Sequence, residues 1–478
     1  MGTSFRRPLA ATVALLCCLS MMTPVVAMPG DVGPVDTADA AVAQDGPPNP
    51  CAGTVTESAE GTTVISVQGF QFGEGGGKQP AKLVGVGPNG DIEWVHQMAE
   101  KFDVRWGYDV DPLPNGTLFV TADLRSEQSI FYEFDPQTQE VVWAKRLDTA
   151  DTHDADLINN GSEILVADMR NYNESAERND DRLFVYNRTT EEREWEWRFD
   201  DHYDRESLEE NYTDDWTHVN DVDKIGEGRY LASPRNFDQA IVVNRSTNEI
   251  DMKLGEDGEK DILNEQHNPD YLESENGTPT LIVGDSENNR IVEYANPVTD
   301  LTDGDGWNRT WTLTGDLDWP RDADRLPSGN TLVTDSANNR VVEVTPEGEV
   351  IWEFYAPWLV YDAARIPAGE HGGPSATDLN ATGSYEIHGG AKLHENQTRL
   401  DECHQTLENS SGLAAGATNG TDETSEGAMD DQTGENDSDA GQGDGTEDPA
   451  STGMAGFGPL AALAGLLVAL GIGVRRRR

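Results

Sequence analysis

A four-residue pattern recurs six times between residues 108 and 364, and its first position carries the side chains that could do chemistry. The second residue is Asp or Asn, and the fourth is Asp in every copy but the last. The first position differs between copies, in chain order Tyr108, His153, Asn220, His267, Arg321 and Tyr361. His218 lies two residues before Asn220 and so on the same face of any strand there. Imidazole, guanidinium, amide and phenol groups thus occupy one point of a repeating unit.

Arg235 provides a second guanidinium, at a position where other copies of the repeat have an acidic residue. In three other copies an Asp ends the short strand after the pattern, and we align Arg235 with these residues, Asp168, Asp285 and Asp335. If the copies surround one axis, the imidazoles and guanidiniums converge in a chain that is otherwise strongly negative. Such a cluster predicts an oxyanion site, with Arg235 as a bidentate donor.

Two other interpretations of these residues are open. His153, His218 and His267 could ligate zinc, although no close-spaced ligand pair supports this and Arg235 would oppose a cation. The polar side chains could instead simply hydrate a tunnel. We expect neither a metal site nor a cofactor.

The elements that must position these residues are short strands. Each of the first five copies is followed by two short apolar strands and a fourth strand, which carries Trp143, Trp197, Met252, Trp311 or Trp352. Short, evenly spaced strands with a periodic aromatic residue indicate a β-propeller, with a linear β-solenoid as the alternative. The sixth copy lacks its own later strands, so we expect residues 63–67, 82–86 and 91–95 to complete its blade. We predict an all-β, six-bladed β-propeller over residues 59–400, closed by strands from both ends.

Four segments of this region resemble the bacterial arylsulfate sulfotransferases, which are periplasmic six-bladed propellers. The matching motifs are Thr152-His153-Asp154, Trp216-Thr217-His218-Val219-Asn220, Arg235 seventeen residues after His218, and Gln266-His267. The resemblance covers most of residues 60–367 but is sparse in motifs elsewhere. The acidic segment and the apolar C-terminus described below depart from the family.

The resemblance implies an enzyme that moves a sulfuryl group from an aryl sulfate to a phenol without a nucleotide sulfate donor. His267 would be the nucleophile that becomes sulfated, while His153, His218 and Arg235 would stabilise charge on the transferred group. A neutral imidazole can attack near neutral pH without a cofactor. From their first positions in the pattern, we predict that four further residues bind substrate: Tyr108, Asn220, Arg321 and Tyr361.

A non-catalytic propeller is the main alternative. Asp285-Ser286-Glu287-Asn288-Asn289-Arg290 and Asp335-Ser336-Ala337-Asn338-Asn339-Arg340 also resemble the NHL-type propellers, which mostly bind partners. In that case the chain would bind a ligand or a protein at the cell surface without turning it over.

The two ends of the chain predict export and membrane anchoring. Residues 1–27, in which Arg6-Arg7 precede a mostly apolar stretch, are interpreted as a signal peptide. A linker over 28–58 follows. Residues 401–453 contain too few large apolar side chains to fold and are predicted to be a disordered acidic stalk. Residues 454–478 contain an uncharged run that can cross a hydrocarbon core of about 30 Å, followed by four arginines. The arginines should stay in the cytoplasm, which places the propeller at the outer cell surface.

The C-terminal order of elements resembles archaeosortase sorting signals, with Ala455-Gly456-Phe457 in place of the Pro-Gly-Phe motif. Thirteen Asn-X-Ser/Thr sequons are possible glycan sites in an exported chain. Outside the apolar N-terminal run, only Cys51 and Cys403 remain, either as a disulfide or as two free thiols.

The charge balance excludes one class of function and suggests a habitat. The chain has 88 acidic and 34 basic residues in 478, a formal net charge of −54. Such a chain repels phosphate backbones, which argues against nucleic-acid binding. Concentrated salt would screen this self-repulsion, so we expect a halophilic protein.

Overall fold

The computed structural model describes residues 49–72, 76–206, 208, 210–297, 306–367 and 372–414. The predicted signal peptide, the stalk beyond residue 414 and the apolar C-terminus lie outside these ranges. Within them, no helix is long and apolar enough to cross a membrane.

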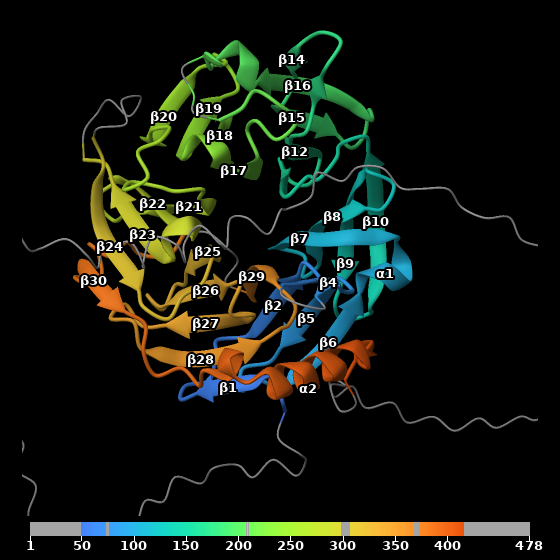
Figure 1. The fold of residues 1–478 in the computed structure, drawn as a ribbon, viewed down its shortest axis with the longest axis vertical. Helices are drawn as coiled ribbons and strands as arrows, with labels where there is room; N and C mark the ends of the chain where they lie inside the picture. The colour runs from blue at the N-terminus through green and yellow to red at the C-terminus, as the bar shows by residue number, and fades with distance from the viewer. Residues whose placement is uncertain are drawn as a thin grey trace, which may run out of the picture. The chain divides into compact units, whose positions relative to one another are not determined.

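Six antiparallel sheets of four main strands surround a central axis, which confirms the predicted propeller (Figure 1). Blade 1 contains β7 (Val104–Pro112), β8 (Leu118–Leu124), β9 (Ser129–Asp135) and β10 (Glu140–Leu147). Blade 2 contains β11 (Ala155–Ile158), β12 (Glu163–Asp168), β15 (Arg182–Asn187) and β16 (Glu192–Arg198). Blade 3 contains β17 (Val219–Gly226), β18 (Arg229–Pro234), β19 (Gln239–Asn244) and β20 (Ile250–Gly255).

The second half of the ring repeats this order. Blade 4 contains β21 (His267–Glu273), β22 (Pro279–Asp285), β23 (Arg290–Ala295) and β24 (Asn308–Thr314). Blade 5 contains β25 (Pro320–Arg325), β26 (Thr331–Asp335), β27 (Arg340–Val344) and β28 (Val350–Tyr355).

Blade 6 joins the two ends of the folded region, as the repeats predict. Its inner strand, β29 (Val360–Ile366), pairs with β2 (Thr62–Val67), and β5 (Lys82–Val86) and β6 (Ile92–Gln97) follow. In Figure 1 the orange β29 lies beside the blue β2. The backbone ladder between these strands closes the ring and leaves no open edge at the junction.

Three short strands outside the repeats add to the outer edges of the blades: one from the predicted linker, one from the end of the predicted propeller region and one from the predicted stalk. β1 (Ala52–Val55) pairs with β28, β30 (Gly383–Glu386) with β24, and β31 (Gly412–Leu413) with β6. Helix α2 (Gln397–Glu408) carries Cys403, which forms a disulfide with Cys51. Ordered structure therefore continues past the predicted boundary at residue 400, because the disulfide and these edge pairings hold both terminal segments on the ring.

The repeated tryptophans pack in the core, with one exception. Trp197, Trp311, Trp352 and Met252 are buried, and Trp94 takes the equivalent place in blade 6. Trp143 is only partly buried, and the Arg188 guanidinium covers its ring at 3.9 Å. In blade 1 the tryptophan thus packs at the edge of the apolar cluster between blades 1 and 2, and a cation–π contact covers its ring.

The Asp at the second position of the pattern connects neighbouring blades. The Asp154 Oδ2 atom accepts a hydrogen bond from the Val222 backbone N–H (2.5 Å), and Asp362 Oδ2 accepts one from the Val110 N–H (3.0 Å). The first bond joins blade 2 to blade 3, and the second joins blade 6 to blade 1. Its recurrence therefore has a structural reason that is separate from the chemistry of the first position.

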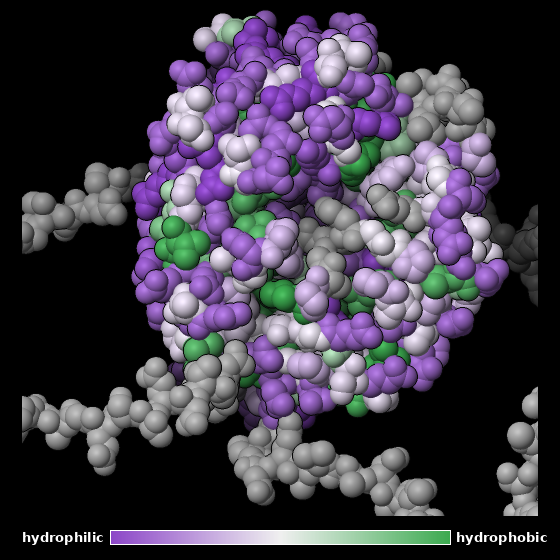
Figure 2. Space-filling model, turned by 180° about the vertical axis from the view of Figure 1, so that it is seen from behind, coloured by the Kyte–Doolittle hydropathy of each residue, from purple (hydrophilic) through white to green (hydrophobic). Residues whose placement is uncertain are grey.

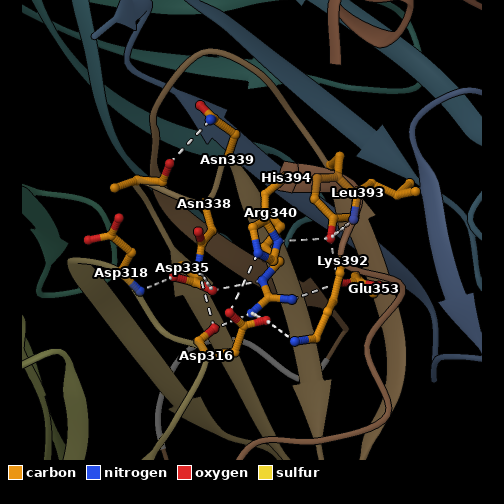
Figure 3. A network of polar contacts seen from close by, with 12 residues as sticks. Asp316, Asp318, Asp335, Asn338, Asn339, Arg340, Glu353, Lys392, Leu393 and His394 are labelled. Carbon is orange, nitrogen blue, oxygen red and sulfur yellow. Dashed lines mark hydrogen bonds and ion pairs between the residues drawn. The ribbon is translucent and has the colours of Figure 1, made fainter. Parts of the chain in front are cut away.

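A buried ion-pair network fastens the C-terminal segment to blade 5 (Figure 3). Arg340 lies between Asp335 (2.7 Å) and Glu353 (2.9 Å), and both carboxylates are fully buried. Glu353 also accepts backbone hydrogen bonds from Ala391 (2.8 Å) and Thr54 (3.1 Å). Glu353, which pairs with Arg340, is thus hydrogen-bonded to both terminal segments. The face of the molecule in Figure 2 is mostly hydrophilic, as the composition requires.

Candidate active site

The first-position residues of five blades, together with His218, meet around the buried ring of Tyr361. From the centroid of that ring to those of Tyr108, His153 and His267 the distances are 5.0, 5.5 and 6.5 Å. The His153 ring lies 5.0 Å from that of His218. None of these side chains is more than 4% exposed. Residues more than 250 positions apart along the chain are therefore brought into one group by the ring of inner strands.

Arg321 is a buried cation that has only neutral hydrogen-bond acceptors. Its guanidinium donates to Gln68 Oε1 (3.1 and 3.2 Å), to the Val360 carbonyl (2.9 Å) and to Ser336 Oγ (3.0 Å). Burial lowers the pKa of Arg321 to about 10, so it keeps its charge at neutral pH. No ion pair within the described ranges involves it. A buried charge without a counter-ion is costly, and an anionic ligand would remove this cost.

Arg235 lies beside the same group but occupies a different position from the one predicted. β18 ends at Pro234, and Arg235 opens a 3-10 turn (Arg235–Phe237) that ends on left-handed Asp238. In blade 4, β22 ends at Asp285, and Ser286 opens the equivalent turn (Ser286–Asn288). Arg235 thus corresponds to Ser286, and the alignment with the strand-ending Asp is wrong by one residue because Pro234 occupies that position. The guanidinium pairs with Glu265 at 3.4 Å and is 13% exposed.

Ser286 fixes the tautomer of His267. The Ser286 Oγ atom lies 2.8 Å from His267 Nδ1, 2.8 Å from the Pro320 carbonyl and 3.3 Å from the Gly284 carbonyl. Carbonyl oxygens can only accept, so the hydroxyl proton goes to one of them and the oxygen accepts the Nδ1–H. This places the proton of the neutral His267 imidazole on Nδ1 and its lone pair on Nε2.

His218 and His153 face carboxylates instead. His218 Nδ1 lies 2.8 Å from Asp215 Oδ1, and His153 Nε2 lies 3.6 Å from Asp151 Oδ1. Arg170 bridges the two acids, at 2.6 Å from Asp151 and 3.0 Å from Asp215. Although burial acts in the opposite direction, His218 and Arg170 lower the pKa of Asp215 to about 2. Both imidazoles therefore have a nearby negative charge that would stabilise their protonated forms.

Burial nevertheless lowers the pKa of all three histidines, which favours their neutral forms at neutral pH. Burial, followed by the charge of Arg235, lowers the pKa of His218 to about 3. Burial, followed by Arg321 and Arg235, lowers the pKa of His267 well below its usual value. Burial also lowers the pKa of His153. An imidazole that stays unprotonated in a cationic pocket is suited to nucleophilic attack on an anion.

Asn220 and Tyr108 brace this group. The Asn220 side-chain amide donates to the Gln266 backbone carbonyl (2.9 Å), and the Asn220 backbone carbonyl accepts from the Tyr361 hydroxyl (3.2 Å). The Tyr108 hydroxyl donates to Asp151 at 2.5 Å. Among the described residues, no group of three or more His, Cys, Asp or Glu side chains is arranged so that it could hold a metal ion.

Five residues of the site escaped prediction: Gln68, Asp151, Arg170, Asp215 and Ser286. Asp151 and Asp215 lie two and three residues before a predicted histidine, so proximity in the chain was an available signal. Ser286 belongs to an Asp-Ser pair that recurs at Ser336, but its role depends on a turn that folds back toward the inner strand. Gln68 and Arg170 had no signal in the sequence.

Comparison with known proteins agrees with the resemblance noted in the sequence. Residues 66–296 match the family model described as arylsulfotransferase (ASST), a range that includes His153, His218, Arg235 and His267. The match suggests an aryl sulfotransferase activity. None of the curated proteins matches the sequence.

Several solved structures are similar at low identity. One is a protein of unknown function from Bacteroides caccae, with 11% identity and a TM-score of 0.42, covering 64% of this chain and 100% of that chain. The virginiamycin B lyase of Staphylococcus aureus has 11% identity and a TM-score of 0.34, covering 57% and 75%. A Myceliophteria thermophila Cps50 β-propeller domain has 10% identity and a TM-score of 0.37, covering 67% and 92%.

Proposed function

We propose that this chain transfers a sulfuryl group from an aryl sulfate to a phenolic acceptor through a sulfated His267. The observation that carries the proposal is Arg321, a buried guanidinium without a counter-ion, close to an imidazole whose Nε2 lone pair is free. An aryl sulfate supplies the missing anion and the electrophile in one molecule.

The partners of the histidines separate their roles. His267 has a neutral partner, Ser286, which leaves Nε2 as a nucleophile but does little to stabilise an imidazolium. His218 has the carboxylate of Asp215, which stabilises the imidazolium that forms when His218 accepts a proton and makes His218 the base. His153, Arg235 and Arg321 stabilise the negative charge on the non-bridging sulfuryl oxygens.

The reaction balances in two steps. In the first, His267 Nε2 forms a bond to sulfur while the bond from sulfur to the phenolic oxygen breaks, and the phenol leaves as its phenolate. In the second, the acceptor phenol gives its proton to neutral His218, its oxygen attacks sulfur, and the nitrogen–sulfur bond breaks. His218 then releases that proton to the solvent, where it balances the phenolate released in the first step. Both steps use the same oxyanion contacts, so ping-pong kinetics are expected.

The location that we propose is the outer cell surface. The predicted signal peptide and the apolar C-terminal segment with its arginine cluster support this placement. The disulfide between Cys51 and Cys403 also supports it, since such bonds persist in oxidising compartments.

The test compares wild type with His267→Asn in molar salt, with p-nitrophenyl sulfate as donor and phenol as acceptor. His388→Asn is the matched control, because His388 is exposed and remote from the histidine group. We expect wild type and His388→Asn to release p-nitrophenol and His267→Asn to lose at least about a thousandfold in kcat, as for loss of a nucleophile. Without acceptor, wild type should gain the mass of one sulfuryl group on the peptide that contains residue 267.

Equal turnover in all three proteins would remove His267 from the mechanism. Absence of turnover in every protein, with tight binding of an aryl sulfate, would favour the non-catalytic propeller.

A further inference from the structure

A row of four aromatic rings leads away from His267. The Trp319 ring lies 5.9 Å from that of His267, and Phe72 lies 6.1 Å from Trp319. Phe70 continues the row at 5.1 Å from Phe72, and Trp106 lies 5.9 Å from Phe70. The row therefore starts at the proposed nucleophile and passes through residues that the sulfuryl-transfer chemistry does not use.

Phe72 is the exposed member of this row. It is 56% exposed and is the one aromatic residue among the large apolar side chains that the described structure leaves exposed. Single exposed apolar residues are common on proteins, but this one continues a packed aromatic surface instead of standing alone. Trp319, which links it to His267, is itself only partly buried.

Both ends of the row are held in place. The Trp319 backbone adopts the left-handed region (φ 54°), and its N–H donates to Asn289 Oδ1 at 2.8 Å. A bulky residue takes this conformation only where its surroundings impose it. Asn289 follows the turn opened by Ser286, so one turn positions both the His267 imidazole and Trp319. The Arg321 guanidinium packs on the Trp319 ring at 4.7 Å.

The Phe72 side is fixed by a short hairpin, β3 (Phe70–Gln71) and β4 (Gly77–Lys78). The Lys78 ammonium donates to the Gly69 carbonyl (2.8 Å) and to the Gln79 carbonyl, and it lies 4.5 Å above the Trp106 ring. The strand that carries Phe70 is thereby tied down, and Phe72 follows it directly.

We propose that Trp319 and Phe72 form an aryl-binding wall that selects acceptors with two fused or linked aromatic rings. This inference rests on the proposed function. The ring that bears the reacting oxygen packs against Trp319 next to His267, and the second ring packs against Phe72. The Trp319 ring lies about 6 Å from both Phe72 and His267, within the range of about 4.5–7 Å in which aromatic rings attract. The three side chains therefore form one continuous surface. A single-ring phenol reaches only the first of the two contacts.

The test measures kcat/KM for phenol and for 2-naphthol as acceptors, with p-nitrophenyl sulfate as the common donor. Wild type should prefer 2-naphthol by about tenfold, the value of one good aromatic contact. In Phe72→Ala the ratio of the two kcat/KM values should fall close to one, and Phe72→Leu should give an intermediate ratio. Val142→Ala is the matched control, because Val142 is 54% exposed on the outer strand of blade 1.

An unchanged ratio in Phe72→Ala, or an equal loss with both acceptors, would overturn the wall. Failure of the proposed function gives a different result, since no acceptor would then be sulfated by any variant. In that case, equilibrium binding of 2-naphthyl sulfate, followed by tryptophan fluorescence, still tests the wall. A Phe72→Ala affinity equal to that of wild type would refute it, and a loss of about tenfold would support it.

Discussion

Ser286 and Asp215 hold two imidazoles of the site in opposite ways. A hydroxyl that passes its proton to a backbone carbonyl can accept the Nδ1–H of His267 but adds no negative charge. A carboxylate at 2.8 Å from His218 adds a full charge. Since the proposed transfer needs one unprotonated attacking group and one group that accepts a proton, these partners support the two proposed roles.

The pH dependence of kcat/KM should reveal the cationic environment of the histidines. Burial and the guanidiniums lower the pKa of His218 to about 3 and that of His267 well below 6.5. A lowered pKa means that protonation, and loss of the nucleophile, occurs only at more acidic pH. With p-nitrophenyl sulfate, wild-type kcat/KM should therefore stay level as the pH falls through about 6.5, the usual histidine value.

Arg235→Gln provides the comparison for this profile. It removes one positive charge next to His218 and His267, so their pKa values should rise and the acid limb should move to higher pH. Arg146→Gln is a control on an outer strand of blade 1. A wild-type acid limb centred near pH 6.5, or identical limbs in wild type and Arg235→Gln, would contradict the proposed electrostatics.

The residues of the site were predictable where the repeat made them stand out. His153, His267 and Arg321 fill one position of a pattern whose other members differ, and the structure brings them together. Ser286 and Gln68 were not predictable, because each acts through a turn or a neighbouring blade that only the closed ring brings near. Arg235 was predicted in the right region but aligned one residue away. The strand before it ends at Pro234, which stands where other blades have an Asp.

The inner strands show how one element serves both stability and chemistry. The aspartates of the pattern accept backbone hydrogen bonds from the next blade, as Asp154 does from Val222 and Asp362 from Val110. The residue one position earlier then points into the group around Tyr361. The strand pairing within each blade and these bonds between blades hold the backbone of the inner strands. The side chain at the first position of the pattern can therefore differ from blade to blade, and the candidate site is built from these differing side chains.

Substitution of Arg340 tests how much the buried ion-pair network of blade 5 contributes to stability. Arg340→Met removes a buried cation between Asp335 and Glu353 and leaves two buried carboxylates without it. Breaking a buried pair in this way costs about 3–5 kcal/mol. The free energy of unfolding, measured by denaturant titration in molar salt, should fall by that amount.

Arg125→Met is the control for this measurement. Arg125 pairs with Asp103 at 3.2 Å, but the two side chains are 56% and 71% exposed. Exposed pairs contribute less than about 1 kcal/mol, so this variant should stay close to wild type. Similar losses in both variants would show that the network of Figure 3 adds no more than a surface pair.

Over the whole molecule, the six blades and the closure of the ring followed from the sequence because each blade repeats one strand pattern. The composition of the sixth blade was predicted because the sixth copy of the pattern has no later strands of its own. The observed pairing of β29 with β2 confirms that the N-terminal strands complete this blade. The edge strands β1, β30 and β31 and the helix α2 were not found, because they match none of the repeats. The pairing of Cys51 with Cys403 fixes where two of them lie.

The net charge of −54 leads to a prediction that concerns all blades at once. At about 1 M salt the screening length is about 3 Å, whereas at about 0.01 M it is about 30 Å and reaches across the molecule. Self-repulsion of the acidic surface should therefore weaken the closed ring as salt is removed. On dialysis from molar to millimolar sodium chloride, we expect the near-UV circular dichroism signal to decrease progressively. The melting temperature should fall in parallel.

A neutral osmolyte separates charge screening from a general effect of solutes. Sorbitol at the osmolality of molar salt leaves the repulsion unscreened, so it should not restore the near-UV spectrum, whereas potassium chloride should restore it as well as sodium chloride does. The intact disulfide limits how far the chain ends can part, so reduction should move the transition to higher salt. A near-UV spectrum and a melting temperature that are unchanged at low salt would show that the fold does not depend on screening.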